Sequence, residues 1–123
     1  MSSTVPVYKN MSPLLPVAHI EDSIEFYTRE LGFSLEFRYE DFYAGIVKDG
    51  YSIHLKSGAP AGKPGKNKED LDIIFSVDGI EHLYQELLHK SIQIVQPLRD
   101  MPYGKEFYIA DMDGNHIGFI EPT

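Results

Sequence analysis

The chain has 123 residues, of which 42% are hydrophobic and 24% charged, the ordinary composition of one globular domain with a single core. It has no cysteine, which excludes disulfides, thiol nucleophiles and thiolate metal ligands. Its net charge of −8 argues against a nucleic-acid partner, because phosphates need a basic surface, and would suit a cationic ligand. The first ten residues lack the apolar stretch of a signal peptide, and no run approaches membrane-spanning length. We therefore expect a cytoplasmic protein that does not bind membranes.

The first half of the sequence predicts a strand, a helix and three more strands. A strand over residues 13–17 leads into an amphipathic helix, whose apolar side chains recur three and four positions apart and so share one face. Gly32 follows the last of them and ends the helix. The apolar face consists of Ile20, Ile24, Tyr27 and Leu31. The three strands are expected over residues 33–39, 42–48 and 51–56, with an Asp-Gly turn between the last two.

The second half repeats this order after a connector. Residues 58–69 are rich in Gly, Pro and Lys and have no apolar periodicity, so they predict a flexible tether. A strand over 72–77 precedes an amphipathic helix over 80–88, where Asp78 and Glu81 are spaced as a capping box. The last three strands are expected over residues 93–96, 106–111 and 116–121. Residues 11–57 and 70–121 are thus predicted as two modules of a single domain over 1–123.

A short phrase occurs once in each half. Phe42-Tyr43 is followed by an Asp-Gly pair and an alternating apolar strand, and so is Phe107-Tyr108. The two copies lie 64 to 65 positions apart. Such an internal repeat predicts an α+β fold of two tandem βαβββ modules, with the functional cleft between the copies. The repeat also predicts that Phe107 is a core residue.

Two stretches of the chain resemble the glyoxalase/bleomycin-resistance/dioxygenase proteins, the vicinal oxygen chelate superfamily. The first is LLPVAHIEDSIEFY at residues 14–27, closed by Leu-Gly-Phe at 31–33. The second is PYGKEFY at residues 102–108, followed by DMDGNHIGF at 111–119. The resemblance covers about residues 11 to 121 and departs at His19, where these proteins usually have Asp. It implies two βαβββ modules that curve around a cleft, commonly completed across a homodimer.

Enzymes of this superfamily hold a divalent metal in the cleft, and the resemblance places the four ligand positions on Ser12, His54, Asp72 and Gly118. Gly118 has no side-chain donor and Ser12 is a weak neutral ligand, which leaves too few strong ligands for a tightly held metal. We therefore expect no cofactor. The alternative is a divalent metal such as Zn, Ni, Mn or Fe, for which His54, Asp72 and His116 are the weak candidate ligands.

The last strands of the two modules, Ile53-His54-Leu55 and Ile117-Gly118-Phe119, are similar to those of the metal-free bleomycin-resistance branch. The side chain of His54 leaves the strand face that its two neighbours occupy, and eight Tyr and seven Phe suit an aromatic binding cleft. The residues expected to contact a ligand are His54, Asp72, Arg38, Tyr43, Tyr51, Tyr103, Ser12 and Gly118. Packing roles for the tyrosines and solvated surface positions for Arg38 and Asp72 are the alternatives.

The resemblance implies a small-molecule binding protein that sequesters an antibiotic, such as a bleomycin-like compound, in a homodimer cleft without catalysis. The alternative function is enzymatic: a metal-dependent lyase of the glyoxalase type, or an extradiol-type dioxygenase, with a divalent metal in the same cleft. A third hypothesis is a degenerate family member that acts as a regulatory or immunity module and has no small ligand of its own. Replacing His54 by alanine separates the three hypotheses. An enzyme would lose turnover and metal binding together, a binding protein would lose only ligand affinity, and a regulatory module would change little.

Overall fold

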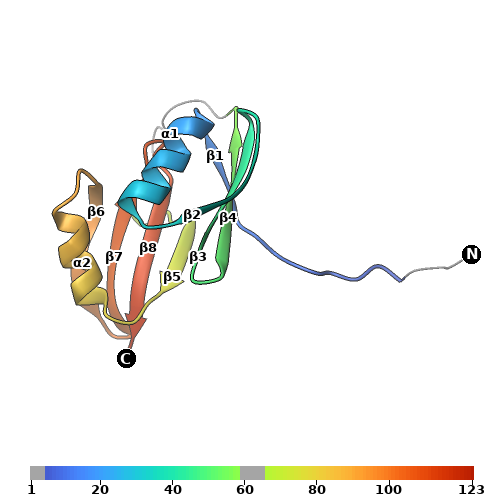
Figure 1. Ribbon diagram of the computed structural model, residues 1–123. Helices are drawn as coiled ribbons and strands as arrows, with labels where there is room; N and C mark the ends of the chain where they lie inside the picture. Colours follow the sequence, from blue (N-terminus) through green and yellow to red (C-terminus); the bar gives the residue numbers. More distant parts are fainter. Residues whose placement is uncertain (1–4, 59–65) are drawn as a thin grey trace, which may run out of the picture.

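The computed structural model describes residues 5–58 and 66–123, which form two modules, each built around a four-stranded sheet (Figure 1). The first module contains β1 (Leu14–Val17), α1 (Ile20–Glu25), the π-helical turn η1 (Phe26–Glu30), β2 (Ser34–Tyr39), β3 (Tyr43–Lys48) and β4 (Tyr51–Ser57). The second contains β5 (Ile73–Ser76), α2 (Ile80–Leu88), β6 (Gln93–Met101), β7 (Gly104–Ala110) and β8 (His116–Pro122). Most of the predicted connector lies outside the described residues.

Both sheets have the same topology. β1 pairs parallel to β4, and β4, β3 and β2 follow one another as antiparallel neighbours. In the second sheet, β5 pairs parallel to β8, and β8, β7 and β6 are antiparallel. The predicted α+β fold of two tandem βαβββ modules is therefore confirmed. Asp49 and Gly50 have φ of 51° and 86°, as the predicted Asp-Gly hairpin turn between β3 and β4 requires.

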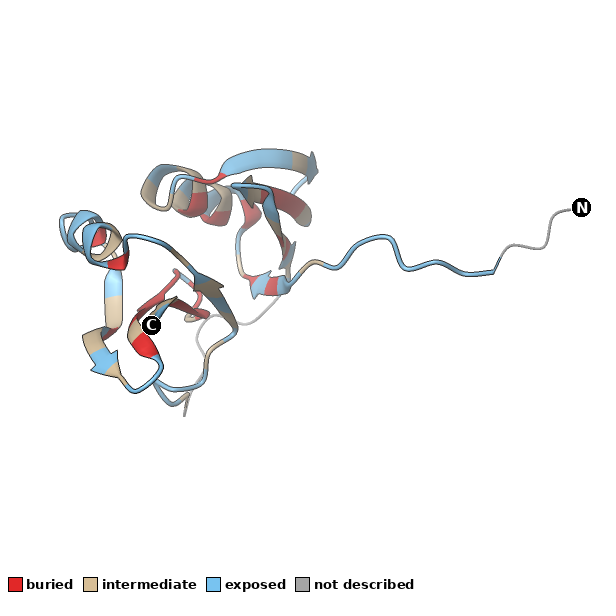
Figure 2. Cartoon of the chain, turned by 90° about the horizontal axis from the view of Figure 1, so that it is seen from below, coloured by how far each residue is buried: buried red, intermediate tan, exposed pale blue. Residues whose placement is uncertain are grey.

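Strand alternation gives each sheet a core face and an opposite face. On β4, Ile53 and Leu55 are buried on the sheet face that the helix covers, so His54 between them points to the opposite face. On β8, Gly118 holds the same place between buried neighbours. We call the faces that carry His54 and Gly118 the open faces of the first and second sheet. Ahead of β1, the chain runs as an exposed extended segment (Figure 2).

The turn between β7 and β8 joins the two modules. Asp113 accepts a hydrogen bond from the backbone N–H of Ala18 at 2.9 Å, and Asp111 accepts one from the Tyr27 hydroxyl at 2.7 Å. Asn115 donates to a β1 carbonyl at 3.0 Å. All three polar side chains of the turn are buried. This turn therefore fixes the start of the first helix against the second module.

The first helix is shorter than predicted. α1 ends at Glu25, and the chain continues as the wider turn η1 up to Glu30. The Thr28 hydroxyl donates to the carbonyl of Ile24 at 2.8 Å, a local bond that competes with regular helical pairing and bends helices. Neither α1 nor α2 is long and apolar enough to cross a membrane, and the same holds for any other helix among the described residues.

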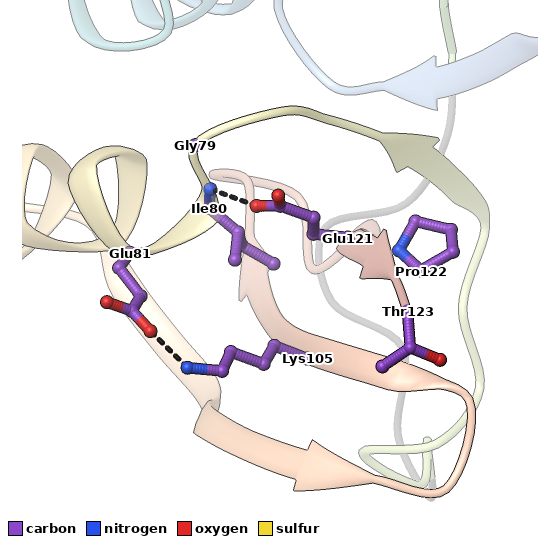
Figure 3. A pocket seen from close by; sticks show the side chains of 7 residues that line it. All are labelled: Gly79, Ile80, Glu81, Lys105, Glu121, Pro122 and Thr123. Carbon is purple, nitrogen blue, oxygen red and sulfur yellow. Dashed lines mark hydrogen bonds and ion pairs between the residues drawn. The ribbon is translucent and has the colours of Figure 1, made fainter.

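The predicted capping box of α2 is wrong. Gly79 precedes the helix in a left-handed conformation, with φ of 77° and no side chain to cap with. The N–H of Ile80 instead donates to the carboxylate of Glu121 on β8 at 2.9 Å (Figure 3). Glu81 forms an ion pair with Lys105 of β7. A carboxylate distant in sequence thus accepts the hydrogen bond of the first backbone N–H of the helix.

β6 is longer than predicted and continues to Met101. It is the edge strand of the second sheet, where the missing N–H of Pro97 is tolerated. Its pairing with β7 shifts register on either side of Gln96, and the shifts carry the strand past the proline. This longer strand places Arg99 opposite Glu106.

Candidate functional site

Three rings lie together on the open face of the first sheet. A hydrogen bond of 2.8 Å joins the Tyr43 hydroxyl and Nδ1 of His54. The Phe37 ring is edge-on to His54, with centroids 5.2 Å apart, and stacks on Tyr43 at 6.0 Å. All three residues are half-buried, so their outer surfaces remain available. We call Phe37, Tyr43 and His54 the ring cluster.

Phe37 reaches the open face because of a β-bulge. Leu35 pairs with the core residue Ile46, but the register then shifts, and Phe37 pairs with Gly45, the neighbour of His54 in the ladder. The Phe37 ring lies across Gly45, where an added Cβ would come within 2.2 Å of it. Only glycine leaves room for the ring there.

A charged cluster lies on the open face of the second sheet. Glu106 is 1% exposed, and its carboxylate accepts hydrogen bonds from Arg99, Tyr103 and Tyr108 at 2.8, 2.6 and 2.8 Å. Arg99 also pairs with Glu69 at 3.0 Å, and its guanidinium lies over the Tyr108 ring, 5.4 Å from the centroid. We call these five residues the Glu106 cluster. Its hydrogen bonds compensate for the burial of the carboxylate.

The protonation states of the Glu106 cluster follow from its contacts. Burial opposes ionisation of Glu106, but hydrogen bonds from Tyr103, Arg99 and Tyr108 outweigh it and lower the pKa of the carboxyl. Burial, followed by the hydrogen bond to Glu106, raises the pKa of Tyr108 to about 12. At neutral pH, Glu106 is therefore an anion and Tyr108 a neutral donor.

The four family ligand positions do not make a metal centre. Gly118 offers no donor, and an added Cβ there would lie 2.9 Å from a Leu71 methyl carbon. Asp72 pairs with Lys66 and accepts the backbone N–H of His116 at 2.7 Å. Within residues 5–58 and 66–123, no three His, Asp or Glu side chains are grouped so that they could hold a metal ion. This donor set does not fit a tightly held divalent metal.

The remaining predicted site residues are dispersed. Arg38 pairs with the core residue Ala44 and binds Glu21 of α1 and Asp41, so it lies on the helix side of its sheet with its charge already paired. Tyr51 is 70% exposed, at the β3–β4 turn. Tyr103 belongs to the Glu106 cluster, while Ser12 precedes β1 and His116 is buried at the start of β8. Two of the eight predicted ligand-contacting residues, Tyr43 and His54, do meet, through a hydrogen bond and a contact between their rings.

The residues predicted from the sequence do not include Phe37, Arg99 and Glu106. The bulge that turns Phe37 to the open face has no local sequence signal, and the predicted end of β6 left Arg99 outside the sheet. One signal was available, since Glu106 and Tyr108 alternate with the core residue Phe107, which is fully buried as predicted.

Comparison with known proteins supports the family resemblance seen in the sequence. A family model described as Glyoxalase/Bleomycin resistance protein/Dioxygenase superfamily matches residues 11–119. A bleomycin resistance protein from Geobacillus stearothermophilus is 29% identical over 126 residues, which cover 89% of this chain and 93% of that protein.

Two solved structures share the fold. The bleomycin-binding protein of bleomycin-producing Streptomyces verticillus, complexed with copper(II)-bleomycin, superposes with a TM-score of 0.73 at 17% identity, over 97% of this chain and 100% of that one. TnmS3, an antibiotic binding protein from Streptomyces sp. CB03234, gives a TM-score of 0.69 at 17% identity, over 96% and 100%. At these identities the likeness concerns the fold alone.

Proposed function

Because the chain belongs to the Glyoxalase/Bleomycin resistance protein/Dioxygenase superfamily, we propose that it binds a bleomycin-like antibiotic in the cytoplasm and sequesters it unchanged. Sequestration needs a concave surface with aromatic side chains and a few placed polar groups, and no reacting residue. The names of the bleomycin resistance protein and the bleomycin-binding protein above support this ligand class.

The ring cluster is the observation that carries the proposal. Phe37 and Tyr43 present aromatic surface on which a planar heterocycle of a ligand can stack, and His54 adds a polar ring edge. The hydrogen bond between Tyr43 and His54 holds both rings in place before a ligand arrives. Such preorganisation reduces the entropy that binding costs.

We further propose that a homodimer completes the site. The two modules of one chain meet through α1, η1 and the core faces of the sheets, as the contacts Tyr27–Asp111 and Phe33–Phe75 illustrate. The open faces therefore remain available to a partner, and they carry exposed apolar side chains, including Leu14 on β1. In the dimer, the ring cluster of one protomer would face the second sheet of the other protomer across a cleft.

Calorimetric titration with copper(II)-bleomycin and with metal-free bleomycin tests the binding function. The wild-type protein should bind one or both forms, and His54→Ala should weaken binding about tenfold through lost stacking and hydrogen bonding. His89→Ala, a replacement on the exposed end of α2, is the matched control and should leave affinity unchanged. Absence of binding by the folded wild-type protein would refute the proposal.

Metal content separates this proposal from the enzymatic alternative. Protein purified without chelator should carry less than about 0.1 divalent metal per chain by plasma mass spectrometry, because two strong ligands are too few. Near-stoichiometric metal that disappears in His54→Ala would contradict sequestration without a resident metal and would favour a lyase or dioxygenase.

A further inference from the structure

A groove of about 520 Å³ lies between the modules, apart from both open faces. One wall is the β3–β4 turn with its Tyr51, and the other is formed by β5 and α2. Figure 1 shows this turn beside β5. The volume falls within the usual range of small-molecule sites. We call it the inter-module groove.

Aromatic rings form the floor of the inter-module groove. Phe33 from the first module and Phe75 from β5 meet with ring centroids 6.1 Å apart. Phe75 in turn stacks on Phe119 of β8 at 5.9 Å, with the planes 21° apart. Phe33 and Phe119 are buried within the core, and the half-buried Phe75 packs between them. A flat apolar body can therefore lie against ring surface contributed by both modules.

The rim of the groove is acidic. Among the described residues, its lining contains Asp49, Asp78 and Glu86, against one permanent cation, Lys48, and one histidine, His82. His82 lies 2.9 Å from Glu86 and offsets its charge only when protonated. With neutral histidine, the lining carries three carboxylates and one ammonium group. Together with the net charge of −8, this imbalance attracts cations and repels anions.

We propose that the inter-module groove is a second ligand site, which binds a flat aromatic molecule that carries a positive charge. The aromatic body lies on the Phe33–Phe75–Phe119 floor, where the ring faces also favour a cation. The positive group reaches the carboxylates of the rim. Because the ligand contacts both modules, its binding stabilises their association and raises the melting temperature of the protein.

Fluorescence titration with 9-aminoacridine, a planar tricyclic cation at neutral pH, tests the proposal. It should bind the wild-type protein with one site per chain, whereas the anion 9-anthracenecarboxylate should bind at least tenfold more weakly. The variant Asp49→Asn/Asp78→Asn/Glu86→Gln neutralises the rim and should weaken 9-aminoacridine binding roughly tenfold, the sum of three partly screened interactions. Asparagine suits position 49, because it tolerates the positive φ of that turn residue.

A matched variant and a blocked groove complete the experiment. Asp22→Asn/Glu25→Gln/Asp100→Asn changes the net charge equally at exposed positions outside the groove and should keep wild-type affinity. Leu83→Trp, which places a larger side chain in the groove wall on α2, should abolish binding while the protein still unfolds cooperatively. Equal affinity in the two triple variants, equal affinity for the anion, or displacement of 9-aminoacridine by bleomycin would each overturn the proposal.

Discussion

At the scale of single residues, the junction between the modules depends on one buried phenol. Tyr27 is fully buried, and its hydroxyl donates to Asp111, which also receives two backbone N–H groups of its own turn. Burial, followed by the neighbouring Asp111 charge, raises the pKa of Tyr27 well above its usual value. The hydroxyl is thus a permanent donor at physiological pH.

Tyr27→Phe should destabilise the protein by about 1–3 kcal/mol, because a buried carboxylate loses a donor that water cannot replace. Urea unfolding followed by circular dichroism measures the difference. Tyr8→Phe is the control, since Tyr8 is 98% exposed and its replacement should cost nothing measurable. Equal stability of Tyr27→Phe and wild type would mean that the Tyr27–Asp111 bond does not hold the modules together.

The lowered pKa of Glu106 predicts that the protein loses stability in acid. Its pKa in the folded protein is lowered, so its contribution is present above the unfolded value of about 4.3 and is lost as the pH falls through the folded pKa. At pH 7, Glu106→Gln should destabilise the protein by about 3 kcal/mol, because Arg99 loses its buried partner.

The stability difference between wild type and Glu106→Gln should shrink as the pH falls from 5 towards 3. Chemical unfolding at a series of pH values measures it, with Glu25→Gln on the exposed side of α1 as a control that shows little pH-dependent difference. A difference that stayed constant across this range would show that Glu106 has the same pKa in the folded and unfolded states.

At the scale of elements, helix α2 obtains its N-terminal cap from strand β8. Glu121 at the end of β8 accepts the N–H of Ile80, while Asp78 and Glu81 make no side-chain cap. The negative charge also lies at the positive end of the helix dipole. The position of this helix is thereby coupled to the end of the second sheet.

Glu121→Ala should cost about 0.5–2 kcal/mol, as the loss of a helix cap does, whereas Asp78→Ala should cost less. Thermal and urea unfolding of the two variants give the comparison. The local capping box expected from the sequence predicts the reverse order, so a larger loss in Asp78→Ala would favour the local cap over the tertiary one.

At the scale of the whole molecule, each open face carries an exposed apolar side chain on its edge strand, and we expect a second protomer to cover these side chains. Leu14 and Ile74 occupy equivalent places on β1 and β5, and they are 50% and 52% exposed. Strands at a sheet edge with apolar side chains favour association with another chain. A two-fold dimer would bring both patches under cover at once.

Light scattering coupled to size exclusion should give twice the chain mass of 14.0 kDa. Leu14→Lys combined with Ile74→Lys should give the single-chain mass and weaken bleomycin binding, because the proposed cleft needs both protomers. Met112→Lys, at an exposed apolar residue outside the open faces, is the control and should remain dimeric. A wild-type protein that elutes as a monomer with full bleomycin affinity would refute the shared cleft.

The sequence by itself determined the order of strands and helices along the chain, the Asp-Gly hairpin turn and the membership of the superfamily. These features depend on local properties: apolar periodicity, turn residues that accept positive φ, and a phrase repeated at a fixed distance. The alternation around His54 also placed its side chain on the correct face without reference to the rest of the chain.

Only the tertiary structure decided which residues meet on the open faces and across the module junction. The bulge before Phe37, the continuation of β6 past Pro97 and the cap from Glu121 each arise where one strand or helix adjusts to another. Such adjustments exchange a local preference for a distant hydrogen bond or a packed ring. The free energy of that exchange belongs to contacts between segments far apart in sequence, and no local pattern encodes it.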